Sequence, residues 1–132
     1  MQGRVVPLHR GTRHRYFPMD QFVITGGLPL HGVIRPAGNK NAALPLLAAC
    51  LLTDEPVVLH NVPAIGDVLT MRNLLEGLGV VFSSVGKNSW KIHAKHISSR
   101  TPNSDLCRTI RASILLAGPM LARKGNLLLP MP

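Results

Sequence analysis

Acidic residues, aromatic residues and cysteines are all scarce in this sequence. Its 132 residues include six Asp and Glu, two Cys and only 4% aromatic residues. So few carboxylates argue against an active site built on paired acids, and two cysteines exclude a disulfide-rich scaffold. The core has to be built mainly from Leu, Val, Ile and Ala. Hydrophobic residues still make up 45% of the chain, which is enough for one folded domain.

Long apolar runs are absent as well. The longest, residues 42–52, contains Pro45 and is too short to cross a membrane. The N-terminus lacks the apolar central segment of a secretory signal, so we expect a cytoplasmic protein without a membrane partner. Cys50 and Cys107 both fall within apolar helical patterns. We interpret them as two reduced core thiols, with a disulfide or metal pair as the alternative.

Basic residues outnumber acidic ones by 15 to 6, which gives a net charge of +9. Residues 1–18 contain four arginines, no acid and no apolar period, and we interpret them as a disordered basic arm. Met19 opens the first regular pattern and is a second candidate for the true start; a transit peptide is the alternative explanation of the arm. Beyond residue 18 the bases are scattered, which favours an anionic small substrate. The competing hypothesis is a small basic module whose arm binds nucleic acid.

The hydrophobic pattern predicts an α/β fold. We expect a helix at residues 67–78, capped by Asp67, and a β-hairpin formed by residues 80–85 and 89–93 around Gly86-Lys87-Asn88. A helix from Asp105, interrupted at Gly118-Pro119, reads as the start of a second unit. The remaining expected elements are strands at 21–25, 30–35, 57–60 and 127–129 and a helix at 41–52. Residues 30–94 thus read strand, helix, strand, helix, strand, strand.

The start of the helix at 41–52 is the first candidate site. The helix is apolar nearly all round, which predicts burial on most sides, and Pro45 falls near its first turn. Gly38-Asn39-Lys40-Asn41 lie where a strand ends and this helix begins. Unpaired N–H groups, the positive end of the helix dipole and the charge of Lys40 together predict an anion or phosphate site, although the spacing of a P-loop is absent. The alternative is that Asn41 is only a helix cap and Lys40 a solvated side chain.

Arg111 is the second candidate. It lies in the middle of the helix predicted from Asp105, and Arg108, three residues earlier, shares its edge. An arginine in so apolar a helix needs a partner when it is buried, and a ligand phosphate or carboxylate is one candidate. A solvent-facing edge is the alternative. The six histidines show no metal-ligand spacing with acids or cysteines, so we predict no metal site.

Several of these segments also resemble a known family. The octapeptide Gly38-Asn39-Lys40-Asn41-Ala42-Ala43-Leu44-Pro45 resembles the signature near the start of the UDP-N-acetylglucosamine 1-carboxyvinyltransferases, a group of bacterial enolpyruvyl transferases. Further matches follow in the family's order: Asn61-Val62-Pro63, Asp67-Val68, Leu78-Gly79, Thr109-Ile110-Arg111-Ala112-Ser113, Gly118-Pro119 and Leu121-Ala122-Arg123. The resemblance runs from Met19 to Pro132. The shikimate-pathway relative has Ser where this chain has Asn41, so it is less similar.

The resemblance implies a fold and a reaction. The family fold has two domains, each made of three βαβαββ units with helices inside and sheets outside, as an inside-out α/β barrel. Residues 19–132 would then form an incomplete domain, with the first unit and part of the second. The family reaction transfers the enolpyruvyl group from phosphoenolpyruvate to the 3-hydroxyl of UDP-N-acetylglucosamine, the first committed step of peptidoglycan synthesis. It needs no metal and no organic cofactor, and no nucleic-acid partner is implied; the oligomeric state stays open.

The resemblance also implies roles for individual residues. Lys40 and Asn41 would contact phosphoenolpyruvate, with Lys40 on its phosphate, and Arg111 would contact UDP-N-acetylglucosamine. Leu115 stands where many members have Trp. The catalytic Cys or Asp of the family is expected just beyond Pro132. On this interpretation the chain is an N-terminal fragment without activity of its own.

Overall fold

A computed structural model of the protein describes Gly27, Pro29 and residues 31–130. The chain divides into two units, Met1–Val33 and Ile34–Pro132. The few described residues of the first unit are exposed and outside helices and strands. The predicted arm at 1–18, the second candidate start at Met19 and the predicted strand at 21–25 lie outside the described residues.

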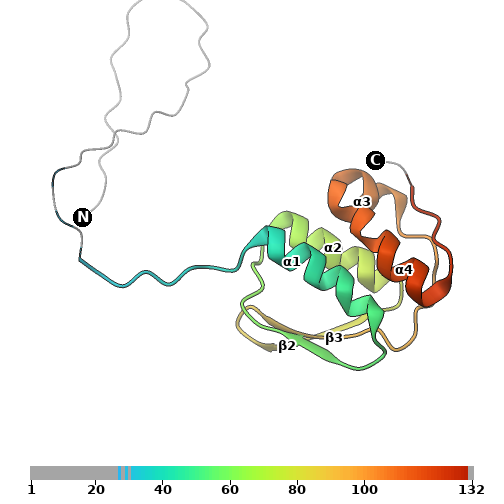
Figure 1. Ribbon diagram of the computed structural model, residues 1–132, viewed down its shortest axis with the longest axis horizontal. Helices are drawn as coiled ribbons and strands as arrows, with labels where there is room; N and C mark the ends of the chain where they lie inside the picture. Colours follow the sequence, from blue (N-terminus) through green and yellow to red (C-terminus); the bar gives the residue numbers. More distant parts are fainter. Residues whose placement is uncertain (1–26, 28, 30, 131–132) are drawn as a thin grey trace, which may run out of the picture. The chain divides into compact units, whose positions relative to one another are not determined.

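The second unit carries the helices and strands of the described chain. In chain order they are α1 (Lys40–Ala49), the 3-10 helix η1 (Cys50–Leu52), β1 (Val57–Leu59), α2 (Gly66–Gly77), β2 (Val81–Gly86), β3 (Ser89–His93), α3 (Ser104–Thr109), the 3-10 helix η2 (Arg111–Leu116) and α4 (Ala117–Lys124). Five predicted elements are confirmed: the helices at 41–52 and 67–78, the strand at 57–60 and both strands of the hairpin. Together they give the α/β layering that Figure 1 shows.

The predicted strand at residues 30–35 is wrong for its described part, residues 31–35. Val33 and Ile34 are 89% and 93% exposed, and the segment has no regular secondary structure. A strand exists only with a hydrogen-bonded neighbour, and the sheet of the described residues contains β1, β2 and β3 alone. Alternation along the sequence could not reveal that this partner is missing.

The three strands form one antiparallel sheet in the order β1-β3-β2. In the centre of the sheet, Ile92 of β3 pairs with Val57 of β1 on one side and with Phe82 of β2 on the other. Asn88, in the turn between β2 and β3, has φ of 53°, a left-handed conformation that asparagine tolerates better than most residues. Turn chemistry and alternation therefore agree, which is why the hairpin could be predicted.

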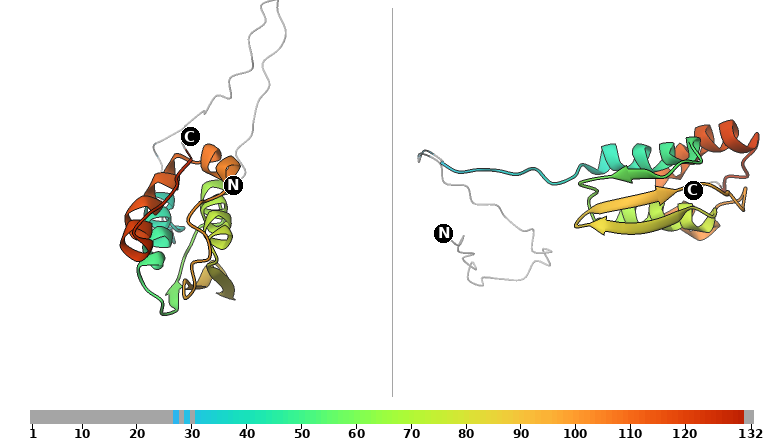
Figure 2. Two further views of the ribbon diagram at one scale, coloured as in Figure 1. Left: turned by 90° about the vertical axis from the view of Figure 1, so that its right-hand side faces the viewer. Right: turned by 90° about the horizontal axis from the view of Figure 1, so that it is seen from below.

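Helices α1 and α2 lie side by side over one face of this sheet, as the two views of Figure 2 show. The contact between the layers is the core. Its largest fully buried side chains include Leu47 of α1, Met71, Leu74 and Leu75 of α2, and Ile92 of β3. Fully burying such a side chain contributes about 1.5–3 kcal/mol, so this layer dominates the stability of the unit.

The predicted helix at 41–52 is confirmed, with two corrections. Its burial is one-sided: Leu44 and Leu47 are buried, whereas Leu46 and Leu52 are 51% and 55% exposed. Pro45 lies in the second turn of α1 rather than the first. Because proline lacks an N–H, the carbonyl of Asn41 loses the hydrogen bond it would otherwise accept within the helix.

The helix predicted from Asp105 is interrupted at another place than expected. Ile110 has extended backbone angles, φ −133° and ψ 124°, and separates α3 from η2. Since a 3-10 helix has three residues per turn, Ser113 and Leu116 share the buried face while Ile114 is 61% exposed. The predicted interruption at Gly118-Pro119 is wrong, because Pro119 is the third residue of α4, where its missing N–H costs little.

The predicted strand at 127–129 is also wrong. Leu128 donates one backbone hydrogen bond to Arg100, but no ladder forms around it. Leu127 and Leu129 pack against the core while Leu128 is 71% exposed. Buried and exposed side chains therefore alternate as in a strand, although the segment belongs to no sheet.

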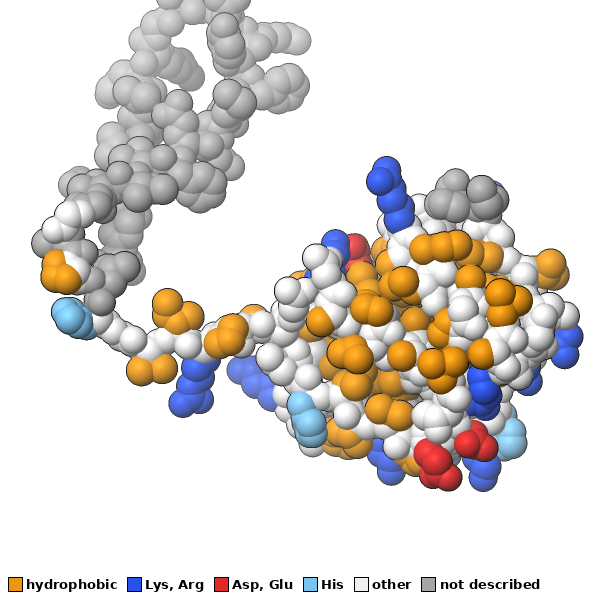
Figure 3. All heavy atoms as spheres, in the orientation of Figure 1, with side chains coloured by type: hydrophobic (Ala, Val, Ile, Leu, Met, Phe, Trp, Pro, Cys, Tyr) orange, Lys and Arg blue, Asp and Glu red, His pale blue; other side chains and the backbone are white. Residues whose placement is uncertain are grey.

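The helix side of the unit exposes many apolar side chains (Figure 3). The most exposed on these elements are Leu46, Leu52, Ile114 and Leu121. None of the helices in the described part is both long and apolar enough to span a bilayer. Cys50 and Cys107 are both buried, as predicted for core residues, and form no disulfide; the Sγ of Cys50 donates a hydrogen bond to the carbonyl oxygen of Leu46 at 3.2 Å.

Candidate functional site

The first turn of α1 is held by the side chain of Asn39. Its Oδ1 accepts hydrogen bonds from the backbone N–H of Asn41 at 2.7 Å and of Ala42 at 3.3 Å. Asn39 has the extended backbone of a helix cap, so the alternative that Asn41 is the cap is wrong. Because Asn39 occupies two first-turn amides, the attraction of this helix start for an anion rests chiefly on the charge of Lys40.

Gly38 fixes the position of this turn against the segment that follows β1. A side chain at residue 38 would overlap the backbone oxygen of Asn61 and lie 2.7 Å from Cδ of Pro63. Asn61 itself is left-handed, with φ of 57°. Two motifs far apart in the sequence, at 38–41 and 61–63, are therefore in direct backbone contact, and glycine is required there.

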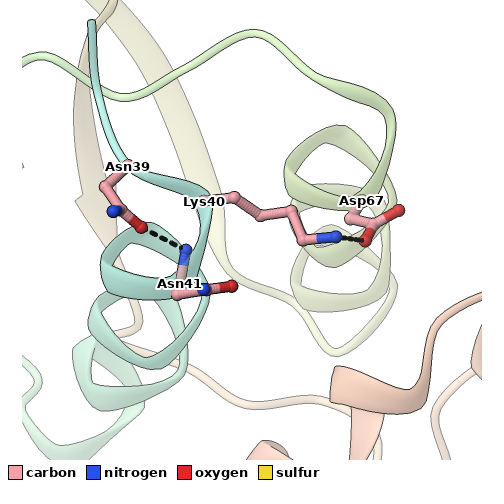
Figure 4. A network of polar contacts seen from close by, with 4 residues as sticks. All are labelled: Asn39, Lys40, Asn41 and Asp67. Carbon is pink, nitrogen blue, oxygen red and sulfur yellow. Dashed lines mark hydrogen bonds and ion pairs between the residues drawn. The ribbon is translucent and has the colours of Figure 1, made fainter. Parts of the chain in front are cut away.

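Lys40 reaches from the start of α1 to the start of α2. Its Nζ lies 2.6 Å from Oδ2 of Asp67, and Figure 4 shows the extended side chain between the two helices. The Lys40 and Asp67 side chains are 46% and 43% exposed, so a ligand from solvent can reach them. The prediction that Asp67 caps α2 is wrong: Ile65 is the cap residue, and its side chain forms no capping hydrogen bond.

Asn41 is exposed next to Lys40, and its side chain points to the same side as the Lys40 ammonium (Figure 4). An ammonium group has three N–H donors and Asp67 takes one of them, while the Asn41 amide can both donate and accept. Lys40 and Asn41 therefore present a charge and a neutral polar group together. That combination can bind a small oxyanion.

Arg111 is the first residue of η2 rather than the middle of a helix. The extended residue Ile110 separates it from Arg108, which ends up in the last turn of α3, so the two arginines do not share a helix edge. Arg111 is exposed, which agrees with the solvent-facing alternative. Since η2 packs against both α1 and α2, Arg111 opens a segment that contacts the two helices joined by Lys40 and Asp67.

A surface pocket of about 320 Å³ lies beside α1. Neither Lys40 nor Asn41 is among its lining residues, so it is separate from the space that they face. Its lining comes from the cap segment, α1 and the end of β1: Ala37, Gly38, Asn39, Ala42, Ala43, Leu46, Leu59, His60, Asn61 and Val62. Within residues 31–130, no cluster of three or more His, Cys, Asp or Glu side chains is arranged to hold a metal ion.

The sequence pattern does not reveal the roles of two residues of this site, Asn39 and Asp67. Asn39 was overlooked as the cap because Asn41 offered the same chemistry two residues later. Asp67 reads as the cap of its own helix and as part of a family match, and only its charge, opposite to that of Lys40, hints at the ion pair. A search for opposite charges at the starts of neighbouring parallel helices would have found the pair.

Known proteins similar to this chain agree on one family. A family model described as EPSP synthase (3-phosphoshikimate 1-carboxyvinyltransferase) matches residues 24–129. UDP-N-acetylglucosamine 1-carboxyvinyltransferase of Treponema denticola is 45% identical over 114 residues, which cover 86% of this chain and 27% of that protein. The protein of the same name from Bradyrhizobium diazoefficiens is 49% identical over 112 residues, covering 85% of this chain and 26% of that protein.

The chain spans about a quarter of the length of these curated relatives. The alternative of a nucleic-acid-binding module finds no support among them. In the solved structures, the enolpyruvyl transferase NikO from Streptomyces tendae has a TM-score of 0.64 and 24% identity, covering 76% of this chain and 23% of that one. This likeness confirms the predicted fold class as part of an enolpyruvyl transferase domain. The chain belongs to the EPSP synthase (3-phosphoshikimate 1-carboxyvinyltransferase) family of enolpyruvyl transferases.

Proposed function

We propose that this chain supplies substrate-binding residues to an enzyme that transfers the enolpyruvyl group of phosphoenolpyruvate to the 3-hydroxyl of UDP-N-acetylglucosamine. The observation that carries the proposal is Lys40, a half-exposed cation at the capped start of α1, inside the octapeptide that resembles the family signature. Two relatives named for this reaction are 45% and 49% identical to the chain. The reaction serves peptidoglycan synthesis, and hence cell shape and division, and it takes place in the cytoplasm on small-molecule substrates.

Lys40 and Asn41 bind phosphoenolpyruvate in this proposal. The ammonium of Lys40 faces the phosphate, where a fixed positive charge stabilises the negative charge that grows as phosphate leaves. Asn41, beside it, donates to an oxygen of the same substrate. Asn41 also favours the UDP-sugar branch of the family over the shikimate branch, which has Ser at this position.

Arg111 binds UDP-N-acetylglucosamine. Its guanidinium is exposed and opens η2, which packs against α1 and α2. A planar guanidinium donates two parallel hydrogen bonds to phosphate oxygens, which suits a nucleoside diphosphate better than an ammonium would. The two substrates would then meet on neighbouring elements of one unit.

The chemistry is an addition followed by an elimination. The oxygen of the sugar 3-hydroxyl bonds to C2 of phosphoenolpyruvate, its proton is removed, and a proton is added at C3, which gives a tetrahedral intermediate. Loss of the C3 proton and of phosphate from C2 then forms the enol ether. We assign Lys40 to the phosphate in both steps, and we assign no proton transfer to residues of this chain.

A hybrid enzyme tests the proposal. The full 132-residue chain replaces the matching segment of the Treponema denticola relative, and phosphate release is measured with both substrates. Lys40→Ala should lower kcat/KM by about 30- to 1000-fold, the equivalent of about 2–4 kcal/mol of transition-state stabilisation. Lys87→Ala, in the exposed hairpin turn, should stay within a few-fold of the parent.

Lys40→Arg should also lose most activity, because a planar guanidinium does not place its charge and donors where the compact ammonium does. Thermal melts confirm that each variant folds. A folded hybrid without phosphate release, or a Lys40→Ala variant as active as Lys87→Ala, would overturn the proposal.

A further inference from the structure

We propose that Asp67 is a positioning residue for Lys40, holding its ammonium where phosphoenolpyruvate binds; this rests on the function proposed above. Lys40 and Asp67 lie 27 residues apart in the sequence, yet Nζ and Oδ2 are 2.6 Å apart. The contact joins the first turn of α1 to the first turn of α2. Within residues 31–130, it is the ion pair that links two different helices.

The role of Asp67 is not explained by helix capping. Its carboxylate forms no capping hydrogen bond with the backbone of α2 and binds a side chain of another helix instead. A gain in stability does not explain the pair either, because both side chains are almost half exposed. Ion pairs that water can reach add little to folding stability, since solvent screens them.

The pair does, however, restrict Lys40. A lysine side chain has four rotatable bonds, and holding it in one conformation costs rotamer entropy. Lys40 is also the first residue of α1, where the positive end of the helix dipole disfavours a cation. Without Asp67, the ammonium would therefore leave the space between the helices for solvent. With Asp67 it is held there before substrate arrives, and two of its three N–H donors stay available for phosphate.

The hybrid enzyme tests this role through Asp67→Asn, which keeps the shape and removes the charge. We expect the KM for phosphoenolpyruvate to rise about tenfold or more, while the KM for UDP-N-acetylglucosamine and the melting temperature stay close to those of the parent. Asp67→Glu should recover part of the loss. Glu76→Gln is the matched control, because Glu76 forms a similarly exposed ion pair with Arg72 at 2.9 Å on the same helix.

A double variant separates positioning from a merely structural role. If Asp67 acts through Lys40, Asp67→Asn should have almost no further effect once Lys40 is alanine. Equal losses in both backgrounds, an effect no larger than that of Glu76→Gln, or a lower KM for phosphoenolpyruvate would each overturn the inference while leaving the proposed function intact. A Lys40→Ala variant with parental turnover would overturn both.

Discussion

Gly38 and Asn61 are packed backbone against backbone, so that no side chain fits at residue 38. A Cβ there would overlap the carbonyl oxygen of Asn61 and approach Cδ of Pro63 to 2.7 Å. The oxygen belongs to a left-handed residue whose neighbour Val62 is tied to Asn88 by a 2.8 Å hydrogen bond. The segment after β1 therefore cannot move aside easily, and the start of α1 is held against it.

Gly38→Ala should destabilise the chain. Overpacking of this kind typically costs about 1–3 kcal/mol, and here the obstacle is backbone rather than a flexible side chain. Urea unfolding of the 132-residue chain measures the effect. Gly118→Ala is the control, because a Cβ at Gly118 in α4 meets nothing within 4 Å and should leave the free energy of unfolding unchanged or slightly higher. Equal stabilities of the two variants would contradict the packing argument.

Asn39→Ala should weaken both the fold and the site. Loss of a helix cap costs about 0.5–2 kcal/mol. Asn103 provides a matched control, since its Oδ1 caps α3 in the same way, with bonds of 2.9 Å and 3.0 Å to the amides of Asp105 and Leu106. We expect similar losses of unfolding free energy from both variants, but a higher KM for phosphoenolpyruvate in the hybrid enzyme only from Asn39→Ala. If the KM for phosphoenolpyruvate were the same in the Asn39→Ala and Asn103→Ala hybrids, the cap of α1 would have no role in substrate binding.

Arg111→Ala should raise the KM of the hybrid enzyme for UDP-N-acetylglucosamine. The loss of a charge-assisted contact to a diphosphate corresponds to about 10- to 100-fold in binding. Arg108→Ala, three residues earlier in the last turn of α3, should have a much smaller effect. Steady-state kinetics with the sugar nucleotide as the varied substrate decides between them. A larger effect at Arg108 would show that Arg108, and not Arg111, contacts the sugar nucleotide.

The buried cysteines should make the chain less stable in alkali. Desolvation by burial raises the pKa of Cys50 and Cys107 above the ordinary value of 9.0, so the folded state keeps these protons longer than the unfolded state does. The cysteine contribution to the unfolding free energy should be constant below about pH 8 and fall as the pH rises through 9 and beyond. Unfolding at pH 7 and pH 10, compared with a Cys50→Ala, Cys107→Ala double variant, isolates this contribution. An identical pH dependence in both proteins would refute it.

Local pattern was enough to predict the elements whose neighbours are close in sequence. The stripe of Val68, Met71, Leu74, Leu75 and Leu78 in and just after α2 is fully buried, as its helical spacing predicted. The hairpin of β2 and β3 could likewise be predicted, because its partner strand and turn residues lie within a few positions.

The errors occurred where tertiary contacts decide the outcome. The break at Ile110 carries no glycine or proline to mark it, and the buried Ile110 has an extended backbone that no local pattern indicates. Pro119, which suggests a helix break in the sequence, is the third residue of α4, where the missing N–H of proline costs little. At the candidate site, Lys40 could be predicted from its place before an apolar helix, whereas its partner Asp67 depends on how α1 and α2 pack.

If phosphoenolpyruvate binds at Lys40 as proposed, the link between Lys40 and Asp67 also couples binding to folding. Neither helix can form the pair alone, because the two charges are 27 positions apart in the sequence and β1 lies between the two helices. The pair therefore depends on a contact between elements far apart in the sequence, unlike the α1 cap, whose hydrogen bonds join residues two and three positions apart. By mass action, an anion that binds only the assembled pair would raise the melting temperature of the chain. Thermal shift with phosphoenolpyruvate would then report on the packing of α1 against α2 without any turnover.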